Sequence, residues 1–271
     1  MMKKVDGIIQ WDRRGWLKAA GAVTAARAVA APGIAATGAA VTAAAVLGGT
    51  PRSASATGAA GSDAKLRIGI VGSGRVGGTL GGVWAKAGHE VMFSSRNIEH
   101  DRSLAAQSGA NARAGTPRQA AAFGEVLLVS VPYGALPEVG KDLAELLAGK
   151  IVIDTSNPFA GRDGEIAAWA RDRGAGLASA QLLPGARIVR AFNAIGYARM
   201  GTAHERRGQI GMPIAGDDAE AIALASRLIR DIGFEPVLIG GLAMGRHLMP
   251  GTPLAGEHPP DEIRRIAATL D

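Results

Sequence analysis

Residues 65–78 read Lys-Leu-Arg-Ile-Gly-Ile-Val-Gly-Ser-Gly-Arg-Val-Gly-Gly, and this stretch decides the fold. Its first seven residues form a short β-rich run, and Gly72, Gly74 and Gly77 follow in a GxGxxG pattern. Residues 79–87 then have helical character, and a second β-rich run covers residues 89–93. A strand, a glycine turn, a helix and a second strand within about thirty residues match the size of one βαβ unit.

The same alternation continues along the rest of the chain. Further strands rich in Val, Ile and Leu are expected over residues 125–131, 150–154, 187–191, 210–215 and 235–239. Helices are expected over residues 135–147, 165–173 and 218–232. Near-continuous apolar strands between helices indicate a parallel sheet that is covered on both faces. The predicted fold class is therefore α/β, a doubly wound parallel sheet of the Rossmann type.

Composition and charge exclude several classes of protein. The 271 residues include no Cys, which excludes a disulfide scaffold and metal sites held by thiolates. The net charge is +6, but residues 1–56 carry +5 of it and the remainder carries +1. Because the basic excess lies in the leader, a nucleic-acid-binding face is not expected.

The leader has the layout of an export signal. Residues 12–18, Asp-Arg-Arg-Gly-Trp-Leu-Lys, precede an Ala- and Gly-rich run that extends to Gly49. This order resembles a twin-arginine signal, and residues 54–56, Ala-Ser-Ala, offer a small-x-small cleavage site. We therefore predict a signal peptide over residues 1–56, a flexible linker over 57–64 and a Rossmann domain over 65–271.

The resemblance of the leader implies a location and a transient partner. The twin-arginine translocase would carry the folded protein to the periplasm or another extracytoplasmic compartment. Two alternatives are an uncleaved membrane anchor and an accidental arginine pair. In the second case the protein would stay in the cytoplasm.

The glycine turn predicts a dinucleotide site. Gly72 would permit the tight turn, Gly74 would let the backbone approach a pyrophosphate, and Gly77 would allow the helix to pack on the strand. The N-terminus of the following helix presents free N–H groups and the positive end of its dipole to phosphates. The alternative is a glycine turn that binds no ligand.

The end of the second strand indicates which dinucleotide is bound. An NAD site usually has Asp or Glu there, which holds the ribose 2′-hydroxyl. This chain has Ser94, Ser95 and Arg96 instead, followed by Asn97. Hydroxyls and a guanidinium bind a 2′-phosphate, whereas a carboxylate would repel it, so we predict NADP. The alternative for Arg96 is an ordinary surface charge.

Later strand ends should complete the crevice, because ligands of such sheets bind beyond the carboxyl ends of the strands. Val131, Pro132 and Tyr133 are expected near the nicotinamide ribose, and Asn157 near the nicotinamide. A simple turn is the alternative at Asn157. The sequence contains neither HExxH nor GxSxG and no tight carboxylate–histidine cluster, so no metal site is predicted.

Taken together, these motifs resemble the NADPH-dependent F420 (8-hydroxy-5-deazaflavin) reductases, which are related to pyrroline-carboxylate reductases. The resemblance covers about residues 66–255 and includes residues 150–158, 189–195, 215–218, 240–243 and Arg246. It implies that Ser73, Ser95 and Arg96 hold NADP. It also implies that Asn193, Ala194 and Ile195 border the nicotinamide and a deazaflavin, to which hydride passes without an obligatory protein acid or base.

The candidate cofactor-binding residues are gathered from these arguments, with no catalytic residue among them: Gly72, Ser73, Gly74, Arg75, Val76, Gly77, Ser94, Ser95, Arg96, Val131, Pro132, Tyr133, Asn157, Asn193, Ala194 and Ile195. Two departures from the family concern function. Asn97 and His100 replace basic residues that often follow the Ser-Arg pair. The chain beyond Leu254 has one short helix in place of the longer helical part that contributes to a homodimer in the family, so a homodimer is only an open expectation.

Three functions stay open on the sequence. The first is hydride transfer between NADPH and a deazaflavin (F420-like) or flavin-type acceptor. The second is reduction of an imine or carbonyl, for which Tyr133, the only phenol expected near the crevice, would donate the proton. The third is a non-catalytic NADP-binding sensor. A β-hydroxyacid dehydrogenase is excluded, because these enzymes use a helical-domain Lys and no Lys follows Lys150.

Overall fold

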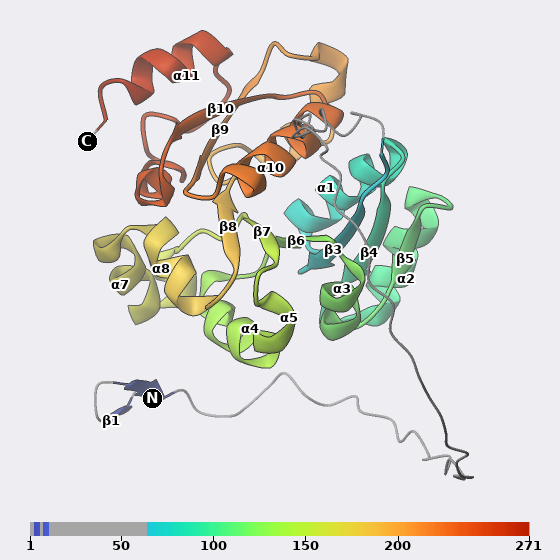
Figure 1. The fold of residues 1–271 in the computed structure, drawn as a ribbon, viewed down its shortest axis with the longest axis horizontal. Coiled ribbons are helices and arrows are strands. Elements are labelled where there is room, and N and C mark those ends of the chain that lie inside the picture. The colour runs from blue at the N-terminus through green and yellow to red at the C-terminus, as the bar shows by residue number, and fades with distance from the viewer. Residues whose placement is uncertain (1–2, 6–7, 11–63, 271) are drawn as a thin grey trace, which may run out of the picture. The chain divides into compact units, whose positions relative to one another are not determined.

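The main sheet contains eight strands in the spatial order β10–β9–β8–β7–β6–β3–β4–β5 (Figure 1). The computed structural model describes residues 3–5, 8–10 and 64–270. The strands of the sheet are β3 (Arg67–Val71), β4 (Glu90–Ser94), β5 (Ala112–Ala114), β6 (Val126–Val129), β7 (Ile151–Asp154), β8 (Arg187–Arg190), β9 (Gly211–Gly216) and β10 (Glu235–Gly240). Each strand predicted from the sequence is present, and β5 was not predicted.

Of the seven predicted strands, five have the predicted parallel direction and two, β9 and β10, do not. The strands β5, β4, β3, β6, β7 and β8 are parallel, in the order of a dinucleotide-binding sheet. Strand β9 runs antiparallel to β8, and β10 is parallel to β9. All six residues of β9 are buried, so its continuous apolar run looks like a parallel strand. Composition alone could not reveal the reversal.

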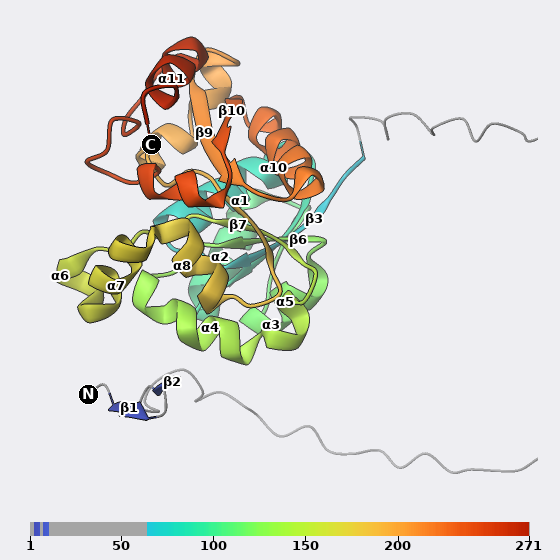
Figure 2. The same cartoon turned by 60° about the vertical axis from the view of Figure 1, so that its left-hand side comes forward.

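Helices cover both faces of this sheet (Figure 2). In that view α1 and α10 lie on one face, and α3, α4 and α5 lie on the other. The helices are α1 (Arg75–Lys86), α2 (Ile98–Ser108), α3 (Pro117–Phe123), α4 (Leu136–Asp142), α5 (Ala144–Leu147), α6 (Ala160–Asp163), α7 (Glu165–Arg173), α8 (Ala175–Leu182), α9 (Tyr197–Met200), α10 (Ala219–Asp231) and α11 (Pro260–Ala267). Short 3₁₀ turns lie at Tyr133–Ala135, Ala203–Arg206 and Leu242–His247. The α/β fold predicted from the sequence is confirmed.

An aromatic cluster fixes α1 on the sheet. The Trp84 ring packs edge-on against Phe192, with ring centroids 6.1 Å apart, and Phe192 packs in the same way against Phe234 at 6.0 Å. Trp84 Nε1 also donates to the Leu228 carbonyl at 2.9 Å. Burying each such ring contributes roughly 1.5–3 kcal/mol, so the cluster holds α1 and α10 in place. The N-terminus of α1 is thereby fixed at the end of β3.

Strands β1 (Lys3–Val5) and β2 (Ile8–Gln10) form an antiparallel pair in a separate unit of the chain. The twin-arginine motif at residues 12–18 and the cleavage site at residues 54–56 lie outside the described residues. In the part of the chain that the structure describes, no helix is long and apolar enough to cross a membrane.

Candidate functional site: a dinucleotide cradle at the strand ends

The glycine turn has the geometry that its spacing predicts. Gly72 has φ = +100°, and a Cβ there would lie 2.3 Å from the Ser130 carbonyl oxygen. A Cβ on Gly77 would lie 2.1 Å from the Gly72 carbonyl oxygen, so only glycine lets α1 pack this closely on the turn. A Cβ on Gly74 would meet nothing within 4 Å. The space in front of Gly74 is therefore open to a ligand.

The N-terminus of α1 faces the same space with its N–H groups uncapped. Gly74 occupies the N-cap position without a side-chain cap, and the first turn contains no acidic residue. Such a terminus is suited to bind a phosphate. The exposed Arg75 guanidinium lies over the Tyr197 ring, 5.6 Å from its centroid, while Val76 packs against the core.

Two of the predicted serine hydroxyls, one at the end of β4 and one in the glycine turn after β3, are turned inward. Ser94 is fully buried and its Oγ donates to the Ile70 carbonyl at 2.6 Å. Ser73 is also fully buried, and its Oγ donates to the Asp101 carboxylate. Both side chains lie beneath the surface on internal partners, and the assignment of Ser73 and Ser94 to the cofactor stays a prediction.

Ser95 and Arg96 differ in what they offer to a ligand. Ser95 is partly exposed, and its Oγ donates to Asp101, with oxygen distances of 2.9 and 3.0 Å. Arg96 is exposed and has no hydrogen-bonding or ion-pairing partner among residues 64–270. His100 Nε2 lies 3.1 Å from the Ser73 carbonyl oxygen, to which it donates. Within residues 64–270, the Arg96 guanidinium is thus available to an anionic ligand at this end of the crevice.

The segment after β6, residues 131–133, borders the crevice with its backbone, and the Tyr133 phenol is buried. Val131 is buried beside Gly72, and Pro132 is exposed. Tyr133 is fully buried, and its hydroxyl donates to the Ala175 carbonyl at 3.0 Å and contacts Ser179 Oγ at 3.1 Å. Burial and the nearby Asp154 raise the pKa of the Tyr133 phenol far above its usual value. The phenol therefore faces the protein interior, and the expectation that residues 131–133 pass near the nicotinamide ribose stays a prediction.

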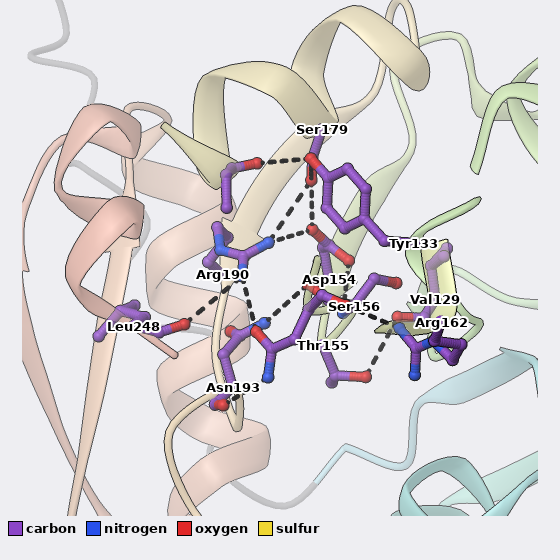
Figure 3. A network of polar contacts seen from close by, with 12 residues as sticks. Val129, Tyr133, Asp154, Thr155, Ser156, Arg162, Ser179, Arg190, Asn193 and Leu248 are labelled. Atoms are coloured by element: carbon purple, nitrogen blue, oxygen red, sulfur yellow. Dashed lines mark hydrogen bonds and ion pairs between the residues drawn. The ribbon is translucent and has the colours of Figure 1, made fainter. Parts of the chain in front are cut away.

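A buried polar network joins the ends of β7 and β8 (Figure 3). Arg190 Nη1 and Asp154 Oδ2 are 2.7 Å apart, and both side chains are fully buried. Ser179 Oγ donates to the same carboxylate oxygen at 2.7 Å, and the Ser156 amide donates to Asp154 Oδ1 at 2.8 Å. The ion pair therefore fixes the turn that follows β7.

Arg190 continues the network to the predicted nicotinamide side. Its Nη2 donates to Asn157 Oδ1 at 3.2 Å, and Asn157 Nδ2 donates to the Asn193 carbonyl at 2.7 Å. Asn193 is buried, and its Nδ2 lies 3.5 Å from the Ser156 carbonyl oxygen. The structure thus brings Asn157, expected at the nicotinamide from the strand ends, into contact with Asn193, which the resemblance assigns to the same region.

Several polar atoms in this network have no internal partner. Among residues 64–270, four buried side-chain nitrogen or oxygen atoms are unpartnered, and three lie here: Ser156 Oγ, Asn193 Oδ1 and Arg190 Nε. Nearby, Phe192 has φ = +65°, a strained conformation for a residue other than glycine. Unpaired buried polar atoms and backbone strain concentrate at functional sites, so these strand ends fit a polar ligand.

Ala194 and Ile195 lead from this network to a surface hollow. The Ala194 carbonyl accepts from the Gly256 amide at 2.8 Å. Ile195 lines a cavity of about 490 Å³ together with Gly196, Ala198, Arg199, Thr202, Gly256 and Glu257. Glu257 pairs with Arg199 at 2.5 Å and with Arg206 at 3.4 Å.

Sequence reasoning missed four residues that shape the site. Asp101 lies in a helix that the sequence analysis did not assign. Asp154 and Arg190 end two apolar strands, and a charged residue at the end of a buried run was the available signal. Tyr197 was also overlooked, although its ring lies beside Arg75 near the glycine turn. No group of three or more metal-ligating side chains occurs in the described residues.

Comparison with known proteins agrees with this geometry. Residues 67–158 match a family model described as "NADP oxidoreductase coenzyme F420-dependent". The rat (Rattus norvegicus) protein "Metalloreductase STEAP3" is 32% identical over 185 residues, which are 67% of this chain and 35% of the relative. The chain therefore spans about a third of the length of this curated relative.

Two solved structures share the fold at lower identity. A hypothetical protein from Sinorhizobium meliloti aligns with a TM-score of 0.59 and 24% identity, over 71% of this chain and 93% of that one. A putative F420-dependent NADP reductase from Arthrobacter sp. FB24 aligns with a TM-score of 0.57 and 22% identity, over 67% and 87% of the two chains. Both likenesses establish the Rossmann-type sheet.

Proposed function

We propose that the chain is an NADP-dependent oxidoreductase of the F420-dependent NADP reductase type, which transfers hydride between NADP(H) and a deazaflavin or flavin-type acceptor. The observation that carries the proposal is the set of unclaimed groups at one edge of the sheet. The open space at Gly74, the exposed Arg96 and the unpartnered atoms of Ser156 and Asn193 all follow parallel strands at their carboxyl ends.

The adenosine half of the dinucleotide is bound by the glycine turn and the end of β4. The N–H groups at the start of α1 hold the pyrophosphate, because the helix end is uncapped and Gly74 leaves room for the ligand. Arg96 holds the 2′-phosphate, since a guanidinium forms paired charge-assisted hydrogen bonds with phosphate oxygens.

The nicotinamide half is bound at the ends of β7 and β8. A carboxamide has one carbonyl acceptor and one N–H₂ donor. The Ser156 hydroxyl can donate to the first, and Asn193 Oδ1 can accept from the second, which would satisfy both unpartnered atoms. When bound, the reduced nicotinamide supplies the hydride. The Asp154–Arg190 pair keeps the binding residues in place.

The acceptor side fits a reaction in which the protein mainly aligns two rings. The hollow beside Ile195 is next to the segment implied to border the nicotinamide. The Tyr133 phenol is buried and its raised pKa disfavours proton release, so this residue is not an acid for imine or carbonyl reduction. Hydride transfer to a deazaflavin or flavin needs no such acid.

One observation keeps the imine or carbonyl reductase as a second candidate. Tyr197 is 43% exposed and lies beside Arg75, so it could present a phenol to a substrate near the glycine turn. The non-catalytic NADP-binding sensor is the third candidate. The first function does not need the Tyr197 phenol, the second needs it as a proton donor, and the third has no turnover.

The test uses the purified chain without the leader and follows oxidation of NADPH and of NADH with F420, FMN, a ferric chelate and a cyclic imine. Turnover with F420 or FMN that is unchanged in Tyr197→Phe supports the proposal. Turnover with the imine that Tyr197→Phe abolishes supports the second function, with Tyr133→Phe as the matched control. Stoichiometric NADPH binding without turnover on any acceptor supports the sensor. Light scattering on the same sample tests for a homodimer.

We also propose that the leader directs export by the twin-arginine translocase, which accepts folded proteins and so permits export with the dinucleotide bound. The arginine pair, the Ala- and Gly-rich run and the Ala-Ser-Ala site support this proposal. Cell fractionation with N-terminal sequencing tests it, and Arg13→Lys combined with Arg14→Lys should keep the protein in the cytoplasm. A cytoplasmic protein that retains residues 1–56 would refute it.

A further inference from the structure

Asp101 is a fully buried carboxylate beneath the predicted 2′-phosphate site. It accepts hydrogen bonds from Ser73 Oγ and Ser95 Oγ, the hydroxyls that the family resemblance assigns to NADP. No Lys, Arg or His of residues 64–270 forms an ion pair with it. Little water screens a buried site, so any charge there acts strongly at short range.

The hydrogen-bonding capacity of the two serine hydroxyls decides whether either can donate to a phosphate oxygen. A serine hydroxyl has one proton and two acceptor lone pairs. The Ser95 proton has internal acceptors in the Asp101 carboxylate at 2.9 and 3.0 Å and, at 3.3 Å, in the Asn97 carbonyl, while the Ser95 oxygen accepts from the Asn97 amide at 3.1 Å. The Ser73 proton is committed to the same carboxylate, and its side chain is buried. Neither hydroxyl has a proton left for a phosphate oxygen.

The Asp101 carboxylate is not needed to cap the N-terminus of α2. The N-cap of this helix is Asn97, whose side chain accepts from the His100 amide at 3.1 Å. His100 in turn directs Nε2 to the Ser73 carbonyl and not to the carboxylate. Among the described residues, the hydrogen bonds of the Asp101 side chain are with the two serines that flank the cofactor site.

We propose that Asp101 sets the cofactor preference of the chain. It withholds both serine protons and places a negative charge beside the 2′ position, so that Arg96 alone attracts a 2′-phosphate and the protein discriminates weakly between NADP and NAD. The inference rests on the proposed function, because it needs a dinucleotide in this crevice. Asp101 acts through the serines and is therefore a positioning residue for specificity.

The test is Asp101→Asn, with dissociation constants for NADP⁺ and NAD⁺ measured by titration calorimetry. The amide removes the charge and donates to one serine, whose own proton is then free to bond the phosphate. The ratio of NADP⁺ to NAD⁺ affinity should rise on the order of tenfold, through tighter NADP⁺ binding. The same shift should appear for 2′,5′-ADP against 5′-AMP. A ratio that is unchanged or lower would overturn the proposal.

Glu99→Gln is the matched control, since it removes an exposed carboxylate two residues earlier in the same helix, where it pairs with Arg102. This variant should leave the ratio within about twofold of the wild type, because an exposed charge is screened. A shift as large as that of Asp101→Asn would mean that net charge, not the serine protons, sets the ratio, and would count against the proposal.

Ser95→Ala provides a test that does not depend on the folding of the Asp101 variant. In the wild-type background it should weaken NADP⁺ binding by less than about twofold, since the hydroxyl proton faces Asp101. In the Asp101→Asn background the same change should weaken it on the order of tenfold. A large loss in the wild type would overturn the inference. If the wild type binds neither NADP⁺ nor NAD⁺, the proposed function fails first.

Discussion

The adenosine end and the nicotinamide end of the proposed site offer different kinds of group to a ligand. At the glycine turn the offered groups are backbone N–H groups and the exposed Arg96, which has no partner in residues 64–270. At the ends of β7 and β8 they are side-chain atoms held in a buried network around Asp154 and Arg190. At the adenosine end, a substitution can therefore change ligand binding without changing the stability of the fold. At the nicotinamide end, the same substitution should change both.

This difference has a physical origin. A turn built from glycines needs no side chains to keep its shape, because strand pairing and helix packing hold it. A polar atom buried at a strand end must be kept in place by other polar groups, and removing one of them leaves the rest unpaired. Substitution of the groups that face the ligand should damage the folded state at the nicotinamide end and leave it intact at the adenosine end, where only the glycines packed against the backbone are needed for folding.

The largest effect is expected for Arg190→Met. The substitution leaves Asp154 as a buried charge without its cation, which should reduce the free energy of unfolding by about 3–5 kcal/mol. Urea denaturation followed by circular dichroism measures the loss. Arg187→Met is the matched control, because Arg187 lies on the same strand but its pair with Asp218 is partly exposed, so its loss should be much smaller. Equal losses in the two variants would contradict the contrast between the ends.

Two Gly→Ala variants in the glycine turn, each adding one methyl group, should affect stability and binding differently. Gly77→Ala places a Cβ against the Gly72 carbonyl and should destabilise the fold by about 1–3 kcal/mol. Gly74→Ala places its Cβ in open space and should leave thermal unfolding nearly unchanged. It should nevertheless weaken NADP⁺ binding tenfold or more, because the methyl group occupies the approach to the pyrophosphate. A Gly74→Ala variant with normal affinity would show that no ligand lies there.

The sequence predicted features that depend on the backbone better than features that depend on side-chain partners. The glycine spacing and the apolar runs were sufficient for β3, α1, β4 and the parallel strands, since backbone requirements are visible in residue type. The direction of β9 was not predictable, because a buried antiparallel strand has the composition of a parallel one. Helix α2 was missed since its sequence is polar and only two of its residues are buried.

Within the site, the sequence could predict position but not side-chain direction. Ser73, Ser94 and Tyr133 all stand at predicted strand ends, yet each side chain is buried on an internal partner. Which way such a side chain turns depends on a residue distant in sequence. Asp101 turns Ser73 inward, and Ala175 and Ser179 do the same for Tyr133. Arg96 has no such partner and stays exposed.

Arg96→Ala should have a moderate effect that is confined to the adenosine end. Loss of the guanidinium should weaken NADP⁺ binding by about 10–100-fold, which corresponds to roughly 1.5–3 kcal/mol for hydrogen bonds to a charged group. NAD⁺ binding and the urea midpoint should change little, because the exposed side chain has no partner in the described residues. Fluorescence titration with NADPH and NADH measures both affinities. An equal loss for the two cofactors would remove Arg96 from the 2′-phosphate site.

The smallest effect is expected for His89. This residue lies at the amino end of β4, away from both the adenosine end and the nicotinamide end of the proposed site. Its Nδ1 accepts from the Leu66 amide at 3.2 Å, so Nε2 carries the proton and donates to Asp231 at 3.0 Å. Burial lowers the pKa of His89 below its usual 6.5, although Asp231 opposes the shift. The folded chain therefore takes up a proton less readily than the unfolded chain, so this contribution to stability is present above about pH 6.5 and is lost as the pH falls below it.

Urea denaturation at pH 7.5 and pH 5.5 checks the sign of this effect. The wild type should lose stability between these values, with a slope of at most about 1.4 kcal/mol per pH unit from this group. His89→Gln should lose less stability over the same interval, because its side chain does not titrate. The exposed His204→Gln is the matched control and should keep the wild-type slope. Affinity for NADP⁺ at pH 7.5 should be the same in all three proteins, since His89 precedes β4 and the cofactor groups follow the strands. A slope that His89→Gln leaves unchanged would assign the acid sensitivity to another group.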